Sequence, residues 1–285
     1  GRARAGRWPG EEAGDAIMTR AIRAEFLKLK GSKVPLWTAL AVVAYASIAV
    51  AGGLAQRSPD FDMTASMTSA GGAWAEAVEL GYYEFGWESL LRQNVQGLAG
   101  GVGILLFGFV TAYVFGRERK EGTDATLLTA PVERRYFAVA KLVIVAAWVL
   151  ALTVFWFCVQ TVGFAAMQPP GFSWSLIWHS LGQSLQAAVI LYAMLPIVGF
   201  VALLGKPGYI KPMIATAMLS SAGPVVSSES AHLYPPTMPV LIDGAAWMPV
   251  VHNELTAVSW AIVAGVFIAG SVAVMWRFAH TADVR

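Results

Sequence analysis

The richest group of functional side chains in this 285-residue sequence lies in one stretch, VFGRERKEGTDATLLTAPVERRYFAVAKL, which begins at Val114. Its first half is a charged run that contains Glu118 and Glu121 and ends at Gly122-Thr123. The chemistry available to such a run is the ion pair and the charge-assisted hydrogen bond. Two interpretations stay open: the carboxylates bind a partner, or they are solvated charges that balance the neighbouring Arg and Lys side chains.

The second half of the stretch predicts a short helix that projects from the rest of the chain. Thr123 and Asp124 have the side-chain oxygens that cap a helix N-terminus, and Pro131 would end the helix. Between them lie Leu127 and Leu128. This pair is predicted to be buried, either against this chain or against a partner.

The segments that must hold this stretch in place can be recognised by their lack of charged residues. The sequence is 56% hydrophobic and 13% charged, against about 25% charged residues in an ordinary soluble domain. From Leu142 to Gly205 it contains no Asp, Glu, Lys or Arg over 64 residues. A charged side chain at a bilayer centre costs about 2.5–3.5 kcal/mol, so charge-free runs of about 20 residues are typical of helices that cross lipid. The sequence therefore predicts an all-α, polytopic membrane protein.

Six such runs predict six transmembrane helices in a single domain. The predicted spans are residues 35–55, 95–115, 142–164, 178–204, 209–227 and 258–276. Tryptophans near the span ends are expected at the level of the lipid headgroups, and these are Trp37, Trp174, Trp178, Trp260 and Trp276. The single Cys158 lies in an apolar run and is predicted to be a buried packing residue.

Basic residues fall in alternate connections between the predicted spans. They occur before span one, between spans two and three, between spans four and five, and after span six. Of the other connections, residues 56–93 contain two Arg against six acidic residues, and residues 165–177 and 228–257 contain no Lys or Arg. Because Lys and Arg concentrate in cytoplasmic loops, both termini are predicted to be cytoplasmic. A net charge of only +2 and the lack of another basic patch indicate no nucleic-acid partner.

The sequence from Met18, MTRAIRAEFLKLKGSK, places Ile22, Phe26 and Leu29 at helical spacing among basic residues. This pattern predicts an amphipathic helix in the inner headgroup plane, with a plain basic tail as the alternative. Residues 1–17 lack the apolar core of a signal peptide. We expect them to be a non-native or disordered extension of the six-span domain, residues 18–285.

Taken together, these features resemble the membrane subunits of type-2 ABC exporters, the permeases of bacterial drug and bacitracin resistance. The likeness depends on an acidic residue, an E-G-T sequence, a Leu pair, a small-Pro-Val turn, a basic residue and a Lys that opens the next span. The matching residues are Glu118, Glu121, Gly122, Thr123, Leu127, Leu128, Pro131, Val132, Arg134 and Lys141. With the span layout and the basic amphipathic opening, the resemblance covers residues 18–285, but no substrate signature is recognisable.

The resemblance implies a mechanism and a set of partners. A cytoplasmic coupling helix after span two would bind a separate ATP-binding subunit, which would hold ATP and Mg²⁺. Two permeases, identical or paralogous, would enclose a pathway in the bacterial plasma (inner) membrane. This chain has no G-x-x-x-x-G-K-[ST] motif, and its one Gly-Lys pair, Gly205-Lys206, precedes Pro207. We therefore expect no catalytic residue, cofactor or metal in the chain itself.

Three other functions stay open. An ion-coupled secondary transporter keeps ionisable groups at membrane depth, and the predicted spans contain no carboxylate. A membrane-embedded enzyme could draw on His232, His252 and Glu254, but these do not form an H-E-x-x-H helix. A non-transporting accessory or immunity protein with the permease fold would have the same sequence pattern.

Overall fold

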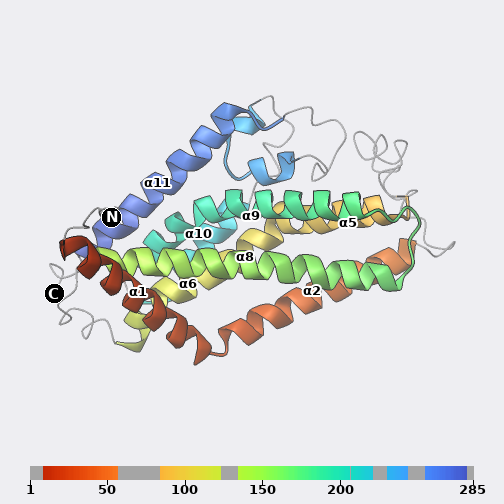
Figure 1. The fold of residues 1–285 in the computed structure, drawn as a ribbon. Coiled ribbons are helices and arrows are strands. Elements are labelled where there is room, and N and C mark those ends of the chain that lie inside the picture. The colour runs from red at the N-terminus through yellow and green to blue at the C-terminus, as the bar shows by residue number, and fades with distance from the viewer. Residues whose placement is uncertain are drawn as a thin grey trace, which may run out of the picture.

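In the computed structural model, the long apolar runs form a bundle of helices (Figure 1). The structure describes residues 9–56, 84–122, 134–205, 207–220, 230–242 and 254–280, with side chains from residue 17 onward. Every regular element within these ranges is a helix. In chain order they are α1 (Pro9–Lys30), α2 (Val34–Gln56), α5 (Trp87–Gly97), η1 (Leu98–Val102), α6 (Gly103–Glu121), α8 (Arg134–Ala166), α9 (Trp174–Ala202), α10 (Ile210–Ser220), η3 (Ala231–Leu233), η4 (Met238–Leu241) and α11 (Ala257–Ala279).

Helix α1 and the ends of three other helices lie together at one end of the bundle, on the left in Figure 1. The three ends are the last turns of α6, the first turns of α8 and the last turns of α11. The basic residues of α1 and of these three ends are Arg20, Arg23, Lys28, Lys30, Arg117, Arg119, Lys120, Arg134, Arg135, Lys141 and Arg277. We call this end of the molecule the basic end.

Among the described residues, five helical stretches are long and apolar enough to cross a bilayer, and they confirm predicted spans one, two, three, four and six. They are Val34–Ala55, Trp87–Glu121, Arg134–Ala166, Trp174–Ala202 and Ala257–Ala279. Predicted span five is shorter as described, because α10 has 11 residues, or about 16 Å at 1.5 Å per residue. Since residues 221–227 lie outside the described ranges, a complete sixth crossing stays a prediction.

The expected helix after Met18 is confirmed as α1. This helix begins at Pro9, so the described residues before Met18 continue the same helix. That residues 1–17 are a non-native or disordered extension stays a prediction.

Span two is interrupted near its middle. Helices α5 and α6 are joined by η1, where Gly100 (φ −82°, ψ 21°) and Gly101 (φ 115°, ψ −28°) leave helical geometry. The φ angle of Gly101 lies in the region that glycine adopts without the steric penalty of a Cβ. Non-helical backbone at membrane depth is tolerated where protein covers it. Ser220 at the end of α10 lies against Gly101, where a Cβ would be 3.7 Å from it, whereas Gly100 is exposed.

Small residues bring the neighbouring helices close to span two. A Cβ on Gly108 would collide with Thr216 of α10, and one on Gly97 would collide with the ring of Tyr45 on α2. Close approach at glycine is a common way for helices to associate in lipid, where dispersion contacts replace the hydrophobic effect.

Trp156 of α8 connects two other helices in the interior. Its indole Nε1 donates to Asn94 Oδ1 of α5 over 2.9 Å, and its ring stacks on Tyr45 of α2 with centroids 4.4 Å apart. The main hydrophobic core surrounds this contact. A separate cluster lies in the half of the bundle away from the basic end and consists of Trp87, Leu90, Leu91, Phe157, Phe164, Met167 and Ile177.

The outer faces of the bundle are apolar, as contact with lipid requires. All five tryptophans expected near the headgroups are exposed, by 40% to 67%. Cys158 is also exposed, so the prediction of a buried cysteine is wrong. In a membrane protein an apolar run does not distinguish the core from the lipid-facing surface, because both environments are apolar.

Replacing Gly101 by Ala should lower the stability of the protein. A Cβ at φ 115° costs about 1–3 kcal/mol, which should lower the apparent melting temperature in detergent by a few degrees. Gly182→Ala in α9 is the control, because a Cβ there meets nothing within 4 Å and Ala favours a helix. Equal melting temperatures for the two variants would contradict the break in span two.

Candidate functional site

Two helix ends at the basic end border the stretch that the sequence singles out. Helix α6 is followed by Gly122 in the left-handed conformation (φ 69°), and its N–H donates to the carbonyl of Glu118. Gly122 thus closes α6, a role that only glycine fills without strain. The chain returns to the bundle at Arg134, where α8 begins. We call residues 122–133 the elbow segment; of these the structure describes Gly122.

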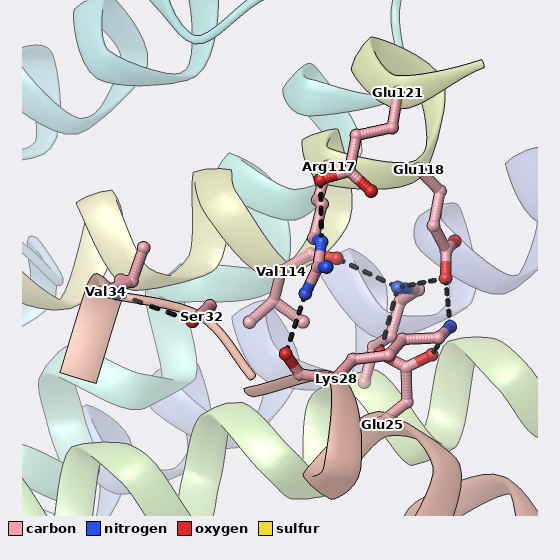
Figure 2. Close-up of polar contacts among 9 residues, drawn as sticks. Glu25, Lys28, Ser32, Val34, Val114, Arg117, Glu118 and Glu121 are labelled. Carbon is pink, nitrogen blue, oxygen red and sulfur yellow. Dashed lines mark hydrogen bonds and ion pairs between the residues drawn. The ribbon is translucent and has the colours of Figure 1, made fainter. Parts of the chain in front are cut away.

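Four charged side chains form a closed ring of ion pairs beside this segment. Lys28 Nζ lies 2.6 Å from Oε1 of Glu25 and 2.6 Å from Oε1 of Glu118. Lys141 Nζ lies 3.2 Å from Oε2 of Glu25 and 3.2 Å from Oε1 of Glu118. Figure 2 shows Glu25, Lys28 and Glu118 pointing toward one another from two helices. Each cation contacts both anions, and we call this cluster the ion-pair ring.

The ion-pair ring joins three helices that are far apart in the sequence. Glu25 and Lys28 come from α1, Glu118 from the end of α6 and Lys141 from the second turn of α8. Three of the four pairs therefore cross between helices: α1 to α6, α1 to α8, and α6 to α8. These three pairs therefore fix the positions of the helix ends relative to one another.

Burial makes the pairing obligatory. The exposed fraction is 4% for Glu25, 6% for Glu118 and 1% for Lys141. A buried charge is strongly unfavourable unless an opposite charge and hydrogen bonds compensate it. Burial lowers the pKa of the half-buried Lys28, but its hydrogen bonds and ion pairs with Glu118 and Glu25 outweigh that effect and raise the pKa above its usual value. The Lys28 ammonium group is therefore charged throughout the neutral pH range.

Backbone carbonyls of the same helices reinforce the ring. Lys141 Nζ donates to the carbonyl of Val114 over 2.9 Å. Arg117 donates through Nη1 to the carbonyl of Lys28 over 2.8 Å and through Nε to Glu121 Oε1 over 2.9 Å. Figure 2 shows Arg117 lying between Lys28 and Glu121. Arg117 thus ties the end of α1 to the last turn of α6.

The end of α6 is also tied to the connection between α9 and α10. Arg119 Nη2 donates to the carbonyl of Gly205 over 2.6 Å. Lys120 Nζ lies 4.5 Å from the ring centroid of Tyr209, a cation–π contact. Both contacts lie within one turn of the elbow segment.

Of the residues predicted to contact a partner, the structure describes four. Glu118 lies inside the ion-pair ring and is not a solvated charge. Glu121 has a half-exposed carboxylate, Gly122 ends α6, and Arg134 Nη1 donates to the carbonyl of Ala279 at the end of α11 over 3.2 Å. The other four, Thr123, Leu127, Leu128 and Pro131, lie outside the described residues. A partner contact by any of the eight stays a prediction.

Helix α1 presents a mixed face to the bundle. Ala21 and Glu25 are buried, Ile22 and Leu29 are half-buried, and Phe26 is 59% exposed. The helix packs against α8 as well as α2. Helix α1 therefore makes a charged contact to the bundle through Glu25, and the interfacial position of Ile22, Phe26 and Leu29 stays a prediction.

Glu25 and Lys28 were not predicted as functional residues. A signal for Glu25 exists, because it is the single acidic residue between Met18 and Gln56 and lies in a basic helix. No comparable signal separates Lys28 from the other basic residues of that helix. Their partners on α6 and α8 are about 90 and 116 residues away along the chain, so only the tertiary fold reveals the ring.

Comparison with known proteins identifies the family. A family model for ABC-2 family transporter proteins matches residues 21–223, more than half of the chain and a range that contains the whole ion-pair ring. This chain belongs to the ABC-2 transporter family. The bacitracin transport permease protein BCRB of Bacillus licheniformis is 28% identical to this ABC-2 protein over 173 residues, which cover 60% of this chain and 82% of that protein. The resemblance to type-2 ABC permeases is confirmed.

Removing one member of the ring should destabilise this ABC-2 protein strongly. In Lys141→Met, two buried carboxylates lose a cation, and breaking a buried pair costs about 3–5 kcal/mol. Glu88→Gln is the control, since Glu88 forms an exposed pair with Arg92 at 2.8 Å and such pairs contribute about 0.2–1 kcal/mol. Thermal unfolding in detergent measures both. A Lys141→Met variant as stable as Glu88→Gln would contradict the buried ring.

Proposed function

We propose that this ABC-2 protein is the permease subunit of an ATP-driven exporter, and that its elbow segment contacts a separate ATP-binding subunit. In this proposal the chain forms half of the transmembrane pathway, and a second permease, identical or paralogous, forms the other half. The observation that carries the proposal is the fixation of both ends of the elbow segment to the bundle by the ion-pair ring. A force on the segment would therefore reach the transmembrane helices as rigid-body movement.

A partner must supply the energy in this mechanism. The sequence has no phosphate-binding loop of the G-x-x-x-x-G-K-[ST] type. ATP and Mg²⁺ would be bound by the partner subunit, and this chain would contribute contact and movement. The relative from Bacillus licheniformis is named as a transport permease, which supports the same division of labour. Its name also makes bacitracin the first compound to test as a substrate.

The basic end would face the cytoplasm of a bacterium, with the protein in its plasma membrane. Helix ends that carry the basic residues lie together in the fold (Figure 1), and Lys and Arg concentrate on the cytoplasmic side. In this orientation α1, the elbow segment and the end of α11 are cytoplasmic, and so are both chain termini. The elbow segment would then be accessible to a cytoplasmic ATPase.

An ion-coupled transporter has less support. Such a protein needs ionisable side chains at membrane depth to bind the coupling ion. The buried carboxylates Glu25 and Glu118 lie at the basic end, and each pairs with two lysines. A non-transporting accessory protein remains an outcome of the experiment below.

Affinity purification of the tagged chain from its native membranes should recover an ATP-binding cassette protein. Glu121→Lys should reduce that recovery at least tenfold, because it reverses the exposed charge next to the elbow segment. Glu88→Lys is the matched control, since each carboxylate pairs with an Arg four residues away, at 2.9 Å for Glu121 and 2.8 Å for Glu88. Glu88 belongs to α5, at the opposite end of span two.

Absence of an ATPase from the purified wild-type protein would overturn the proposed function and favour the accessory-protein alternative. Equal recovery of the ATPase with Glu121→Lys and Glu88→Lys would contradict the proposal that the elbow segment contacts the ATP-binding subunit. Leu127→Asp with Leu128→Asp provides an independent test of the same contact, because both leucines lie in the elbow segment.

A further inference from the structure

We propose that the surface shared by the end of α6 and the start of α10 binds an anionic phospholipid, with two lysines on its phosphate and the exposed face of α10 along its acyl chains. Lipid binding here depends on neither an ATPase nor a transported molecule, so it goes beyond the proposed function. We call this surface the lipid site, and its main residues are Lys120, Tyr209, Ile210, Lys211, Ile214 and Met218.

Tertiary contacts bring the two lysines to one corner of the bundle. Tyr209, which precedes α10, packs on α6, because a Cβ on Gly116 would lie 3.2 Å from its ring. Lys120 Nζ lies 4.5 Å from the centroid of the same ring. Lys211 follows two residues after Tyr209, and its Nζ would lie 2.6 Å from a Cβ on Gly205. The end of α6 and the start of α10 therefore present their ammonium groups together.

Positive charge at this corner exceeds negative charge. Arg119 Nη2 donates over 2.6 Å to the carbonyl of the residue beside which Lys211 Nζ lies, so a third cation is close. The carboxylate of Glu121 pairs with Arg117 at 2.9 Å. Lys120 and Lys211 are both exposed, and neither forms an ion pair within the described part of the chain. An anion is the ligand that complements these two ammonium groups.

The surface next to these cations is apolar. Along α10, Ile210, Ile214 and Met218 follow one another at successive turns and are 77%, 52% and 67% exposed. Helix α6, which packs on α10, adds Leu105 and Phe109, with 40% and 36% exposed. The ligand that fits both parts of the surface has an anionic group at one end and a long apolar part.

The length of this apolar face agrees with a lipid of one leaflet. As described, α10 has 11 residues, or about 16 Å, which is half of a hydrocarbon core of about 30 Å. It begins beside Lys120 and ends at Ser220, which lies against the break in span two at Gly101. A phospholipid places its phosphate and its acyl chains over this same distance. A free phosphate or an acidic protein segment would match the lysines and leave the apolar face unused.

Native mass spectrometry of the purified full-length protein in detergent measures the binding. The two probes are phosphatidylglycerol and phosphatidylcholine with identical acyl chains, which differ in net charge. The parent should bind its first phosphatidylglycerol at least tenfold more tightly than phosphatidylcholine, because only the former has a net negative charge for the lysines. Equal affinity for the two lipids would overturn the proposal.

The double variant Lys120→Gln/Lys211→Gln tests the headgroup contact. It should weaken the binding of the first phosphatidylglycerol at least tenfold, because each lysine near an anionic lipid contributes about fivefold in affinity. Lys30→Gln/Lys33→Gln is the matched control, since it removes two exposed lysines at and after the end of α1. The control should bind as the parent does. An equal loss in the control would show a general effect of surface charge and would overturn the specific site.

A charge-conserving variant separates recognition from a folding defect. Lys120→Arg/Lys211→Arg keeps both positive charges and should retain the affinity of the parent for phosphatidylglycerol. Loss of binding in this variant to the same extent as in Lys120→Gln/Lys211→Gln would contradict recognition by charge.

Two further outcomes would assign the lysines to another ligand. Displacement of phosphatidylglycerol by excess inorganic phosphate would indicate a site for free anions and overturn the lipid assignment. Unchanged lipid binding in Lys120→Gln/Lys211→Gln together with lower recovery of the ATPase would assign the lysines to a protein contact, and it would also overturn the proposal. Inorganic phosphate that leaves the bound phosphatidylglycerol in place would support it.

Discussion

Two buried carboxylates, the buried ammonium group of Lys141 and the half-buried ammonium group of Lys28 constrain the rest of this structure. Each charge would be unfavourable alone in a site with so little water, and together they cancel. This mutual dependence determines how the N-terminal helix, the end of span two and the beginning of span three lie relative to one another. The ring is therefore both a folding constraint and a mechanical connection, and the elbow segment starts and ends beside it.

The break in span two divides this span into two helices, α5 and α6, and the ion-pair ring holds the end of α6. On one side of Gly100 and Gly101, α6 is held by the ring and by the contacts of Arg117 and Arg119. On the other side, α5 packs into a separate apolar cluster with residues of α8 and α9. Both halves of this transmembrane span pack against α8 and α9, but their far ends are held by different contacts, and a non-helical turn lies between them.

The apolar runs and charge pattern were enough to predict the all-helical membrane fold, because the low solubility of charge in lipid leaves a strong signal. The same signal could not distinguish the core from the lipid-facing surface, and so Cys158 was misplaced. The sequence singled out Glu118 as a member of a charged run, and the structure places it in the ion-pair ring. Its partners could not be predicted, because the pairing of Glu25 and Lys28 with Glu118 and Lys141 arises from tertiary packing between distant helices. The break at Gly101 was not predicted either, because a glycine in an apolar run does not show whether it permits close helix packing or a non-helical turn.

The most direct measurement is a pair of cryo-electron microscopy structures of the permease with its co-purified ATPase, one without nucleotide and one with ATP trapped. The account predicts residues 122–133 against the ATPase in both states, with Glu25, Lys28, Glu118 and Lys141 in mutual contact and with α1, the end of α6 and the start of α8 superimposable as one body. An open ring in either state, or residues 122–133 on the face away from the ATPase, would contradict it.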